Sequence, residues 1–422
     1  MSDLSRRRLL AGGAGLSAAA ALAACDRLVE PRATQAANAG ATSGTTATQR
    51  PADPNASPSE QPSTTAPATP DSDGSWRDSG PQPHQPTPEK LKAGDTPPQF
   101  VVVSWDGAGE SVKSPLLARF RGLSQELGGS MTLFLSGLYM LPNTKRTLYK
   151  PPGKPVGSSS IPFLADESVH ATIEGIGKAW LEGHEIGTHF NGHFCGANGV
   201  GSWSPDQWKD EITQAVGFVK NWKTNTGFTD LPPLPFDYSK ELVGARTPCL
   251  EGSENLRIAA NDLGWRYDTS SNGIQMWPSK ARKLWALDLQ SIPFVGHKGQ
   301  VMSMDYNMMY NQSKTTNGDP AKHATWQQEA VDSYVAGFQR AYDGNRAPLI
   351  IGNHFESWNN GIYMTAVEQF MRKVATYPDA RLVSFRQLCD YLDAQDPAVL
   401  AQLRTLQIGA APKNGWKTFL TA

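Results

Sequence analysis

The sequence predicts an α/β fold whose parallel sheet closes as a barrel. Strand-like and helix-like runs alternate from residue 99 to residue 395, and such alternation is typical of parallel βαβ units. Most of the strand-like runs are continuous and apolar, as strands buried on both faces are. We find no internal sequence repeat.

The expected elements follow one another at short intervals. The strands cover residues 99–106, 131–137, 184–189, 242–247, 265–271, 283–289, 301–307, 348–354 and 381–385. The helices cover residues 115–127, 169–183, 204–227, 253–264, 326–344, 363–378 and 385–395. Ser204 followed by Pro205 marks a helix start, because serine caps the first turn and proline is tolerated within it.

The composition narrows the classes of function. A chain of 422 residues accommodates one large domain or two medium ones. The 39 basic and 40 acidic residues leave a net charge of −1, which gives no electrostatic reason to expect a nucleic-acid partner. We therefore expect no nucleic-acid binding, and we expect a monomer.

The first 25 residues have the features of a targeting segment. A basic cluster at residues 6–8 precedes an apolar run at 9–24, which is shorter than the roughly 20 residues that span a bilayer. SRRRLL resembles a twin-arginine export signal, and LAAC resembles a bacterial lipobox with Cys25 as the lipidated residue. We expect an exported lipoprotein, anchored in the bacterial membrane and facing the extracytoplasmic side. The alternative is an uncleaved signal anchor.

Composition also divides the rest of the chain. Residues 26–96 consist largely of Ala, Thr, Ser, Pro, Gly and Gln, and such a segment cannot bury enough apolar surface to fold. We expect a disordered linker there, a catalytic domain at 97–395 and a C-terminal tail at 396–422.

Candidate catalytic residues stand where the expected strands end. Active-site residues of parallel barrels follow the carboxyl ends of the strands, and here these positions hold Asp106, His189 with His193, Arg246, Asp268, Asp305 and His354. Two imidazoles four positions apart can point at one cation, and a carboxylate from another strand can complete the ligand set. The alternatives are local roles: carboxylates that cap helices or loops, histidines of the core and a structural ion pair.

These residues resemble the motifs of the polysaccharide deacetylase family, whose catalytic domain is the NodB homology domain. The resemblance covers residues 99–394 and rests on SWDGA at 104–108, HFNGH at 189–193, RTP at 246–248, YDTS at 267–270 and LIIGNH at 349–354. It implies a distorted (β/α) barrel of about seven strands.

The resemblance also implies roles for single residues. His189 and His193 would hold a divalent metal ion, with zinc expected, and Asp106 would be the base that Arg246 orients. His354 would protonate the leaving group, held in place by Asp268.

One departure concerns the third metal ligand, because the family's metal-binding aspartate falls on Gly107. Asp106 could shift to bind the metal, the two histidines could bind it with waters, or metal and activity could be lost. Asp305 and Glu110 are the nearest substitutes.

The resemblance implies an exported, metal-dependent hydrolase that removes acetyl groups from a polysaccharide. The glycan could be peptidoglycan, chitin-like or xylan-like, with Trp105, Asp305 and Trp358 in contact with it, and Trp203 as a further stacking candidate. The alternatives are a non-catalytic glycan-binding lipoprotein of the cell wall and a hydrolase of another amide C–N bond.

The motifs also imply a cysteine pairing. Cys195 follows the second motif and Cys249 follows the third, so the two cysteines are neighbours if both motifs line one rim. We expect a Cys195–Cys249 disulfide that joins the two loops, with Cys389 as a buried free thiol.

Overall fold

The computed structural model describes residues 72–196 and 198–421. The targeting segment at 1–25, its lipidation site Cys25 and the linker as far as residue 71 lie outside the described residues, so these predictions stay untested.

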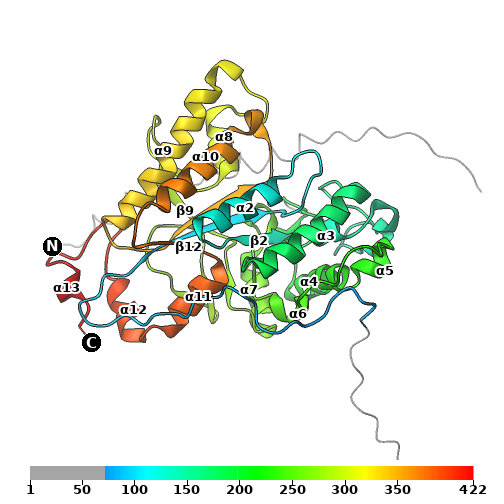
Figure 1. The fold of residues 1–422 in the computed structure, drawn as a ribbon, viewed down its shortest axis with the longest axis horizontal. Helices are drawn as coiled ribbons and strands as arrows, with labels where there is room; N and C mark the ends of the chain where they lie inside the picture. Colours follow the sequence, from blue (N-terminus) through cyan, green and yellow to red (C-terminus); the bar gives the residue numbers. More distant parts are fainter. Residues whose placement is uncertain (1–71, 197, 422) are drawn as a thin grey trace, which may run out of the picture. The chain divides into compact units, whose positions relative to one another are not determined.

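The predicted α/β class is confirmed by a curled sheet of mostly parallel strands (Figure 1). Its order is β11-β1-β2-β3-β4-β5-β8-β7, and β12 also pairs with β1. The strands are β1 Gln99–Asp106, β2 Thr132–Leu135, β3 Glu185–Thr188, β4 Gly244–Ala245, β5 Tyr267–Asp268, β7 Lys280–Ala281, β8 Leu284–Ala286, β11 Leu349–His354 and β12 Ala380–Val383. All of these pairs are parallel except β7 with β8.

The barrel is incomplete, which is its main distortion. Among the described residues, the path of the large sheet ends at β11 and β7 without a ladder between them. A second sheet of β6 Asn272–Gly273, β9 Leu289–Pro293 and β10 Gln300–Met302 lies beside β11. A single parallel bridge from Met304 to Gly352 connects this region to β11.

Helices cover the outside of the sheet (Figure 1). They are α2 Leu116–Leu127, α3 Asp166–Leu181, α4 Pro205–Lys220, α5 Trp222–Thr226, α6 Tyr238–Glu241, α7 Ser253–Asp262, α8 Asp305–Gln312, α9 His323–Tyr342, α10 Trp358–Val374, α11 Phe385–Ala394, α12 Pro397–Leu403 and α13 Trp416–Phe419. The predicted start of α4 is confirmed by a capping box, in which Ser204 and Gln207 each bond to the other's backbone N–H. No helix of the described part has the length and apolar character needed to cross a membrane.

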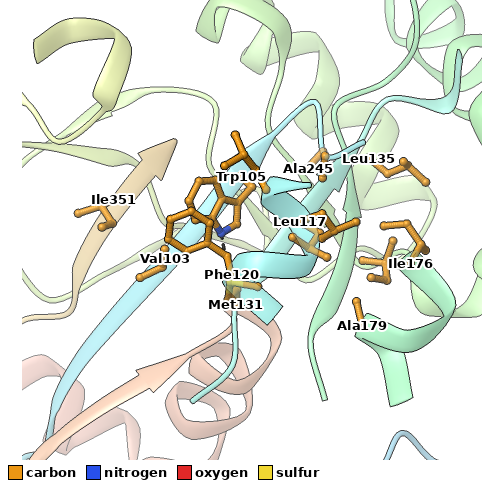
Figure 2. Close-up of a cluster of buried hydrophobic side chains, with 14 of the residues drawn as sticks. Val103, Trp105, Leu117, Phe120, Met131, Leu135, Ile176, Ala179, Ala245 and Ile351 are labelled. Carbon is orange, nitrogen blue, oxygen red and sulfur yellow. Dashed lines mark hydrogen bonds between the residues drawn. The ribbon is translucent and has the colours of Figure 1, made fainter. Parts of the chain in front are cut away.

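The core lies between the sheet and these helices, and β1 is buried in it along its whole length. Trp105 is fully buried there, with its ring 4.2 Å from that of Phe120 and its Nε1–H donating to the sulfur of Met131 at 3.2 Å (Figure 2). Successive side chains of a strand point to opposite faces, so Asp106, the next residue, points away from this cluster.

The structure corrects the predicted start of the ordered chain. Residues 72–96 are not a disordered linker: Trp76 forms a parallel bridge with Leu234, and Ser75 is fully buried. Further along, the Gln82 side-chain amide donates to the carbonyls of Trp180 and His184 at 3.0 and 2.8 Å. These hydrogen bonds are between segments far apart in the chain, which local composition does not reveal.

Two further boundaries differ from the prediction. The strand expected at 301–307 ends at Met302, and α8 begins at Asp305. The tail at 396–422 includes α12 and α13, and Leu403 of α12 is fully buried. Core contacts of both segments, and the Asp396 cap of α12, override the strand-like or polar character of their sequence.

Candidate active site

The strand ends bring the candidate catalytic residues together at one edge of the sheet. Asp106 ends β1 and His354 ends β11, and the two are register partners in adjacent parallel strands. His189 directly follows β3, and Arg246 directly follows β4. The Arg246 backbone N–H donates to the carbonyl of Thr188 at 3.2 Å, which aligns these two strand ends.

A buried ion pair joins Asp106 to Arg246. The Arg246 Nη1 donates to Asp106 Oδ1 at 2.7 Å and to Ser104 Oγ at 2.9 Å, and its Nη2 donates to Thr269 Oγ1 at 3.0 Å. Burial acts to raise the pKa of Asp106, but the guanidinium of Arg246, with a smaller contribution from the His354 imidazolium, holds it below its usual range. Asp106 is therefore ionised at neutral pH and can accept a proton.

His354 is paired with Asp305. Its Nδ1 lies 2.8 Å from Asp305 Oδ1, and its backbone N–H donates to Asp305 Oδ2 at 2.7 Å. Burial acts to lower the pKa of His354, but the carboxylate of Asp305, with a smaller contribution from Asp106, raises it to about 9. At neutral pH His354 is thus an imidazolium that can donate its Nε2 proton.

The predicted partner of His354, Asp268, is wrong. Asp268 instead accepts hydrogen bonds from the Arg257 Nε at 2.7 Å and from the Ser270 hydroxyl. Burial raises its pKa, against the opposing contributions of Ser270 and Arg257. The position of Asp268 at the end of β5 is as expected, but its side chain stabilises the neighbouring loop.

The two motif histidines have the properties of metal ligands. The Nδ1–H of His189 donates to the carbonyl of Arg246 at 2.8 Å, which leaves the Nε2 lone pair available. The ring centroids of His189 and His193 are 5.1 Å apart. Burial lowers the pKa of both imidazoles, to about 3 for His193, so both are neutral, which is the form that binds a metal. These two residues fit a divalent cation.

A third protein ligand is not in place beside them. Within residues 72–196 and 198–421, Asp106, His189 and His193 do not form a set of ligand atoms within 4.8 Å of one another. The Glu110 carboxylate accepts from the backbone N–H groups of Ser111 and Ala118, at 3.1 and 2.8 Å, near the start of α2. Asp305 is hydrogen-bonded to His354. Neither Glu110 nor Asp305, the two proposed substitutes for the third ligand, is therefore directed at His189 and His193.

Gly107 has space for a short side chain. Its φ is +63°, and a Cβ there would lie 3.7 Å from the Tyr139 ring and 3.8 Å from the Ser136 Oγ, which are ordinary contact distances. The Ser136 Oγ is buried and has no hydrogen-bond partner within the described part of the chain. Position 107 therefore carries no carboxylate, but the described residues around it leave space for a short side chain.

The predicted disulfide is confirmed. Cys195 and Cys249 are bonded, with their Cα atoms 6.1 Å apart, and they join the loop after β3 to the loop after β4. Cys389 is buried and free, as expected.

Two of the three residues expected to contact substrate are wrongly assigned. Trp105 lies in the core, and Asp305 is fully buried beneath His354. Trp358 is half-buried with its ring 5.2 Å from that of His354, so it alone of the three borders the site. Trp203, the further stacking candidate, is buried against Trp208.

Sequence reasoning missed Ser104 and Thr269, which hold the Arg246 guanidinium. A signal for Ser104 existed, because it stands two residues before Asp106 in β1 and strand side chains alternate with a period of two. No comparable signal points to Thr269, which follows a strand of two residues.

Comparison with solved structures finds polysaccharide deacetylases and a pseudoenzyme of the CE4 family. A protein described as a polysaccharide deacetylase from Mycobacterium smegmatis is 15% identical, with 74% of this chain and 94% of that chain covered and a TM-score of 0.44. A polysaccharide deacetylase of Pseudomonas aeruginosa is 13% identical, with 70% and 91% covered and a TM-score of 0.42. A CE4 family pseudoenzyme from Bacillus anthracis is 11% identical, with 72% and 70% covered and a TM-score of 0.36.

Sequence comparison adds no further relative. No family model matches this chain, and no curated protein matches it significantly. The functional argument below therefore rests on the geometry of this chain's own residues.

Proposed function

We propose that this protein is an exported, metal-dependent polysaccharide deacetylase of NodB type, which removes acetyl groups from an amino-sugar-containing or otherwise acetylated glycan. The observation that carries the proposal is the pairing of an ionised carboxylate, Asp106, with an imidazolium, His354, on adjacent strands. Groups whose environments move their pKa values apart in this way are suited to act as base and acid in one reaction.

The residues of this chain would divide the reaction among them. A divalent metal ion held by His189 and His193 would supply Lewis-acid polarisation of the acetyl carbonyl. Asp106 would accept the proton of the attacking water, while the Arg246 contact at 2.7 Å keeps it ionised and oriented. His354 would donate its Nε2 proton to the leaving nitrogen or oxygen, because its Nδ1 is committed to Asp305.

Trp358 is the best candidate for contact with a sugar ring. Its half-buried indole lies beside His354, with the ring of Tyr306 5.8 Å away. Amphipathic aromatic rings with one open face suit the apolar face of a pyranose. Peptidoglycan, chitin-like and xylan-like glycans all present such rings.

Export and lipid anchoring are part of the same proposal, and the N-terminal sequence supports them. The basic cluster, the short apolar run and Cys25 lie in residues 1–25. They would place the enzyme at the outer side of the bacterial membrane, where envelope glycans are accessible.

A non-catalytic glycan-binding role is the second candidate, and the third-ligand position favours it. Gly107 supplies no carboxylate, and the described residues contain no replacement beside His189 and His193. A hydrolase of another amide C–N bond would use the same acid and base on a different substrate.

Acetate release separates these candidates. The full chain should release acetate from acetylated peptidoglycan, chitin oligosaccharides or acetylated xylan, and Asp106→Asn should reduce the rate by about 10²–10⁴-fold. Asp230→Asn is the matched control, because Asp230 is exposed and its carboxylate is paired with the ring of His170, away from the site. Elemental analysis should find less metal in His189→Ala than in wild type.

The other outcomes assign the protein differently. Metal binding without acetate release from any of these glycans would favour the amide hydrolase. Absence of both, with retained binding to a glycan, would favour the glycan-binding protein.

A further inference from the structure

A second cluster of metal-ligand side chains lies at the disulfide between the two loops. Within the described residues, His193, Cys195 and Cys249 are the one set whose ligand atoms all lie within 4.8 Å of one another. All three residues are half-buried. The His193 Nδ1 lies 3.7 Å from the Cys195 Sγ.

The spacing between His193 and Cys195 matches that of a zinc site with one imidazole and two thiolates. Bond lengths of about 2.3 Å to sulfur and 2.0–2.1 Å to nitrogen place tetrahedral donors about 3.6 Å apart for N and S, and about 3.8 Å apart for two S atoms. The observed N to S distance of 3.7 Å already fits. Only the bond between the sulfurs prevents their use as ligands.

We propose that reduction of the Cys195–Cys249 disulfide creates a second metal site, formed by His193 and the two cysteine sulfurs, that binds Zn²⁺. A dithiol reductant supplies two electrons and two protons: it becomes a disulfide, and the Sγ–Sγ bond of the protein becomes two thiols. Zinc then replaces both thiol protons, which leave to solvent. The fourth position is open to water.

The two loops are also joined by a contact other than the disulfide. The backbone N–H of Gly196 donates to the Glu251 carboxylate at 3.0 Å, which links the segments carrying Cys195 and Cys249 independently of their sulfurs. This link, together with the pairing of β3 with β4, favours a short distance between the two thiols after reduction.

The site also has a consequence for the histidine pair. His193 belongs both to the cluster with the cysteines and to the pair with His189. The redox state of the disulfide would therefore decide how many protein ligands are available to a zinc ion bound at His193. The reduced protein would bind zinc more tightly than the oxidised one. The inference does not depend on the substrate proposed above.

Cobalt substitution of the full chain tests this site without an activity assay. The His189→Ala variant removes the histidine pair, and Co²⁺ alone is then added to oxidised and to phosphine-reduced protein. Thiolate ligands give Co²⁺ a charge-transfer absorption in the near ultraviolet, so we expect this band in the reduced protein only. Cys389→Ser, which changes the buried free cysteine, is the matched control and should retain the band.

Further variants identify the ligands. Cys195→Ser and Cys249→Ser should each abolish or strongly weaken the band, and His193→Ala in the His189→Ala background should weaken it. The proposal is overturned if reduced His189→Ala protein with native circular dichroism gives no band, or if the band persists when both cysteines are serine. Because the reduced chain carries its native cysteines, this outcome is readable even where a serine variant fails to fold.

Discussion

The pairing of His354 with Asp305 gives the sharpest prediction. Asp305 is fully buried, and both of its oxygens are in use: Oδ1 with the His354 Nδ1 at 2.8 Å and the Tyr306 N–H at 2.7 Å, Oδ2 with the His354 N–H. Asp305→Asn keeps the size of the side chain and removes its charge. The pKa of His354 should then fall well below 9, because burial acts to lower it and its main opposing cause is gone.

The magnitude follows from the pKa. A folded-state value of about 9 against an ordinary value of 6.5 corresponds to about 3 kcal/mol in favour of the imidazolium. Since the folded-state value is the higher one, this stabilisation is complete below the unfolded pKa and is lost as pH rises through about 9. The free energy of unfolding of wild type should therefore fall by up to about 3 kcal/mol between about pH 6 and pH 10, and Asp305→Asn should lack most of this fall.

Two measurements check the prediction. Urea unfolding followed by circular dichroism gives the free energy at both pH values, and NMR titration of the His354 ring gives its pKa directly. If the enzyme releases acetate, the basic limb of its pH–rate profile should move to lower pH in Asp305→Asn. Asp268→Asn is the informative control: a lowered His354 pKa in that variant, with an unchanged one in Asp305→Asn, would refute the assignment.

Substitutions at four further positions test the rest of the site. Arg246→Met should lower the free energy of unfolding at neutral pH by about 3–5 kcal/mol, since it leaves the buried Asp106 unpaired; a loss below about 1 kcal/mol in urea unfolding would contradict the geometry. Trp105→Ala should lower the free energy of unfolding by about 3–5 kcal/mol in the same assay. Trp358→Ala should change stability little and raise KM for the glycan. The reverse pattern would place Trp105 in the binding site. Gly107→Asp should raise the affinity for Zn²⁺ in a calorimetric titration, and Gly107→Ala, which has the same backbone strain at φ +63°, should not.

Several features could be predicted from sequence because they depend on local pattern. The eight apolar-rich residues of β1 match the predicted strand at both ends, since a strand buried on both faces needs a continuous run of such residues. The Cys195–Cys249 disulfide could be predicted because each cysteine closely follows a motif at a neighbouring strand end.

Other features depended on contacts that local pattern does not encode. Trp105 was expected to contact the glycan, yet it packs against Phe120 of α2, on the opposite face of β1 from Asp106, because adjacent strand residues point to opposite faces. The strap at 72–96 has a composition typical of disorder, but hydrogen bonds to α3 and to the end of α11 hold it in place.

The sequence by itself determined that Asp106, His189, Arg246 and His354 stand at or directly after the carboxyl ends of strands, because burial and side-chain alternation are visible in short runs of residues. Only the tertiary structure decided which carboxylate meets which imidazole. Asp305 is 49 residues from His354, and a hydrogen bond of 2.8 Å between them depends on how the β10–α8 segment settles against β11. The carboxyl ends of parallel strands lie at one edge of the sheet whatever the conformation of the loops. Which side chains come within hydrogen-bond distance there depends on how the loops pack.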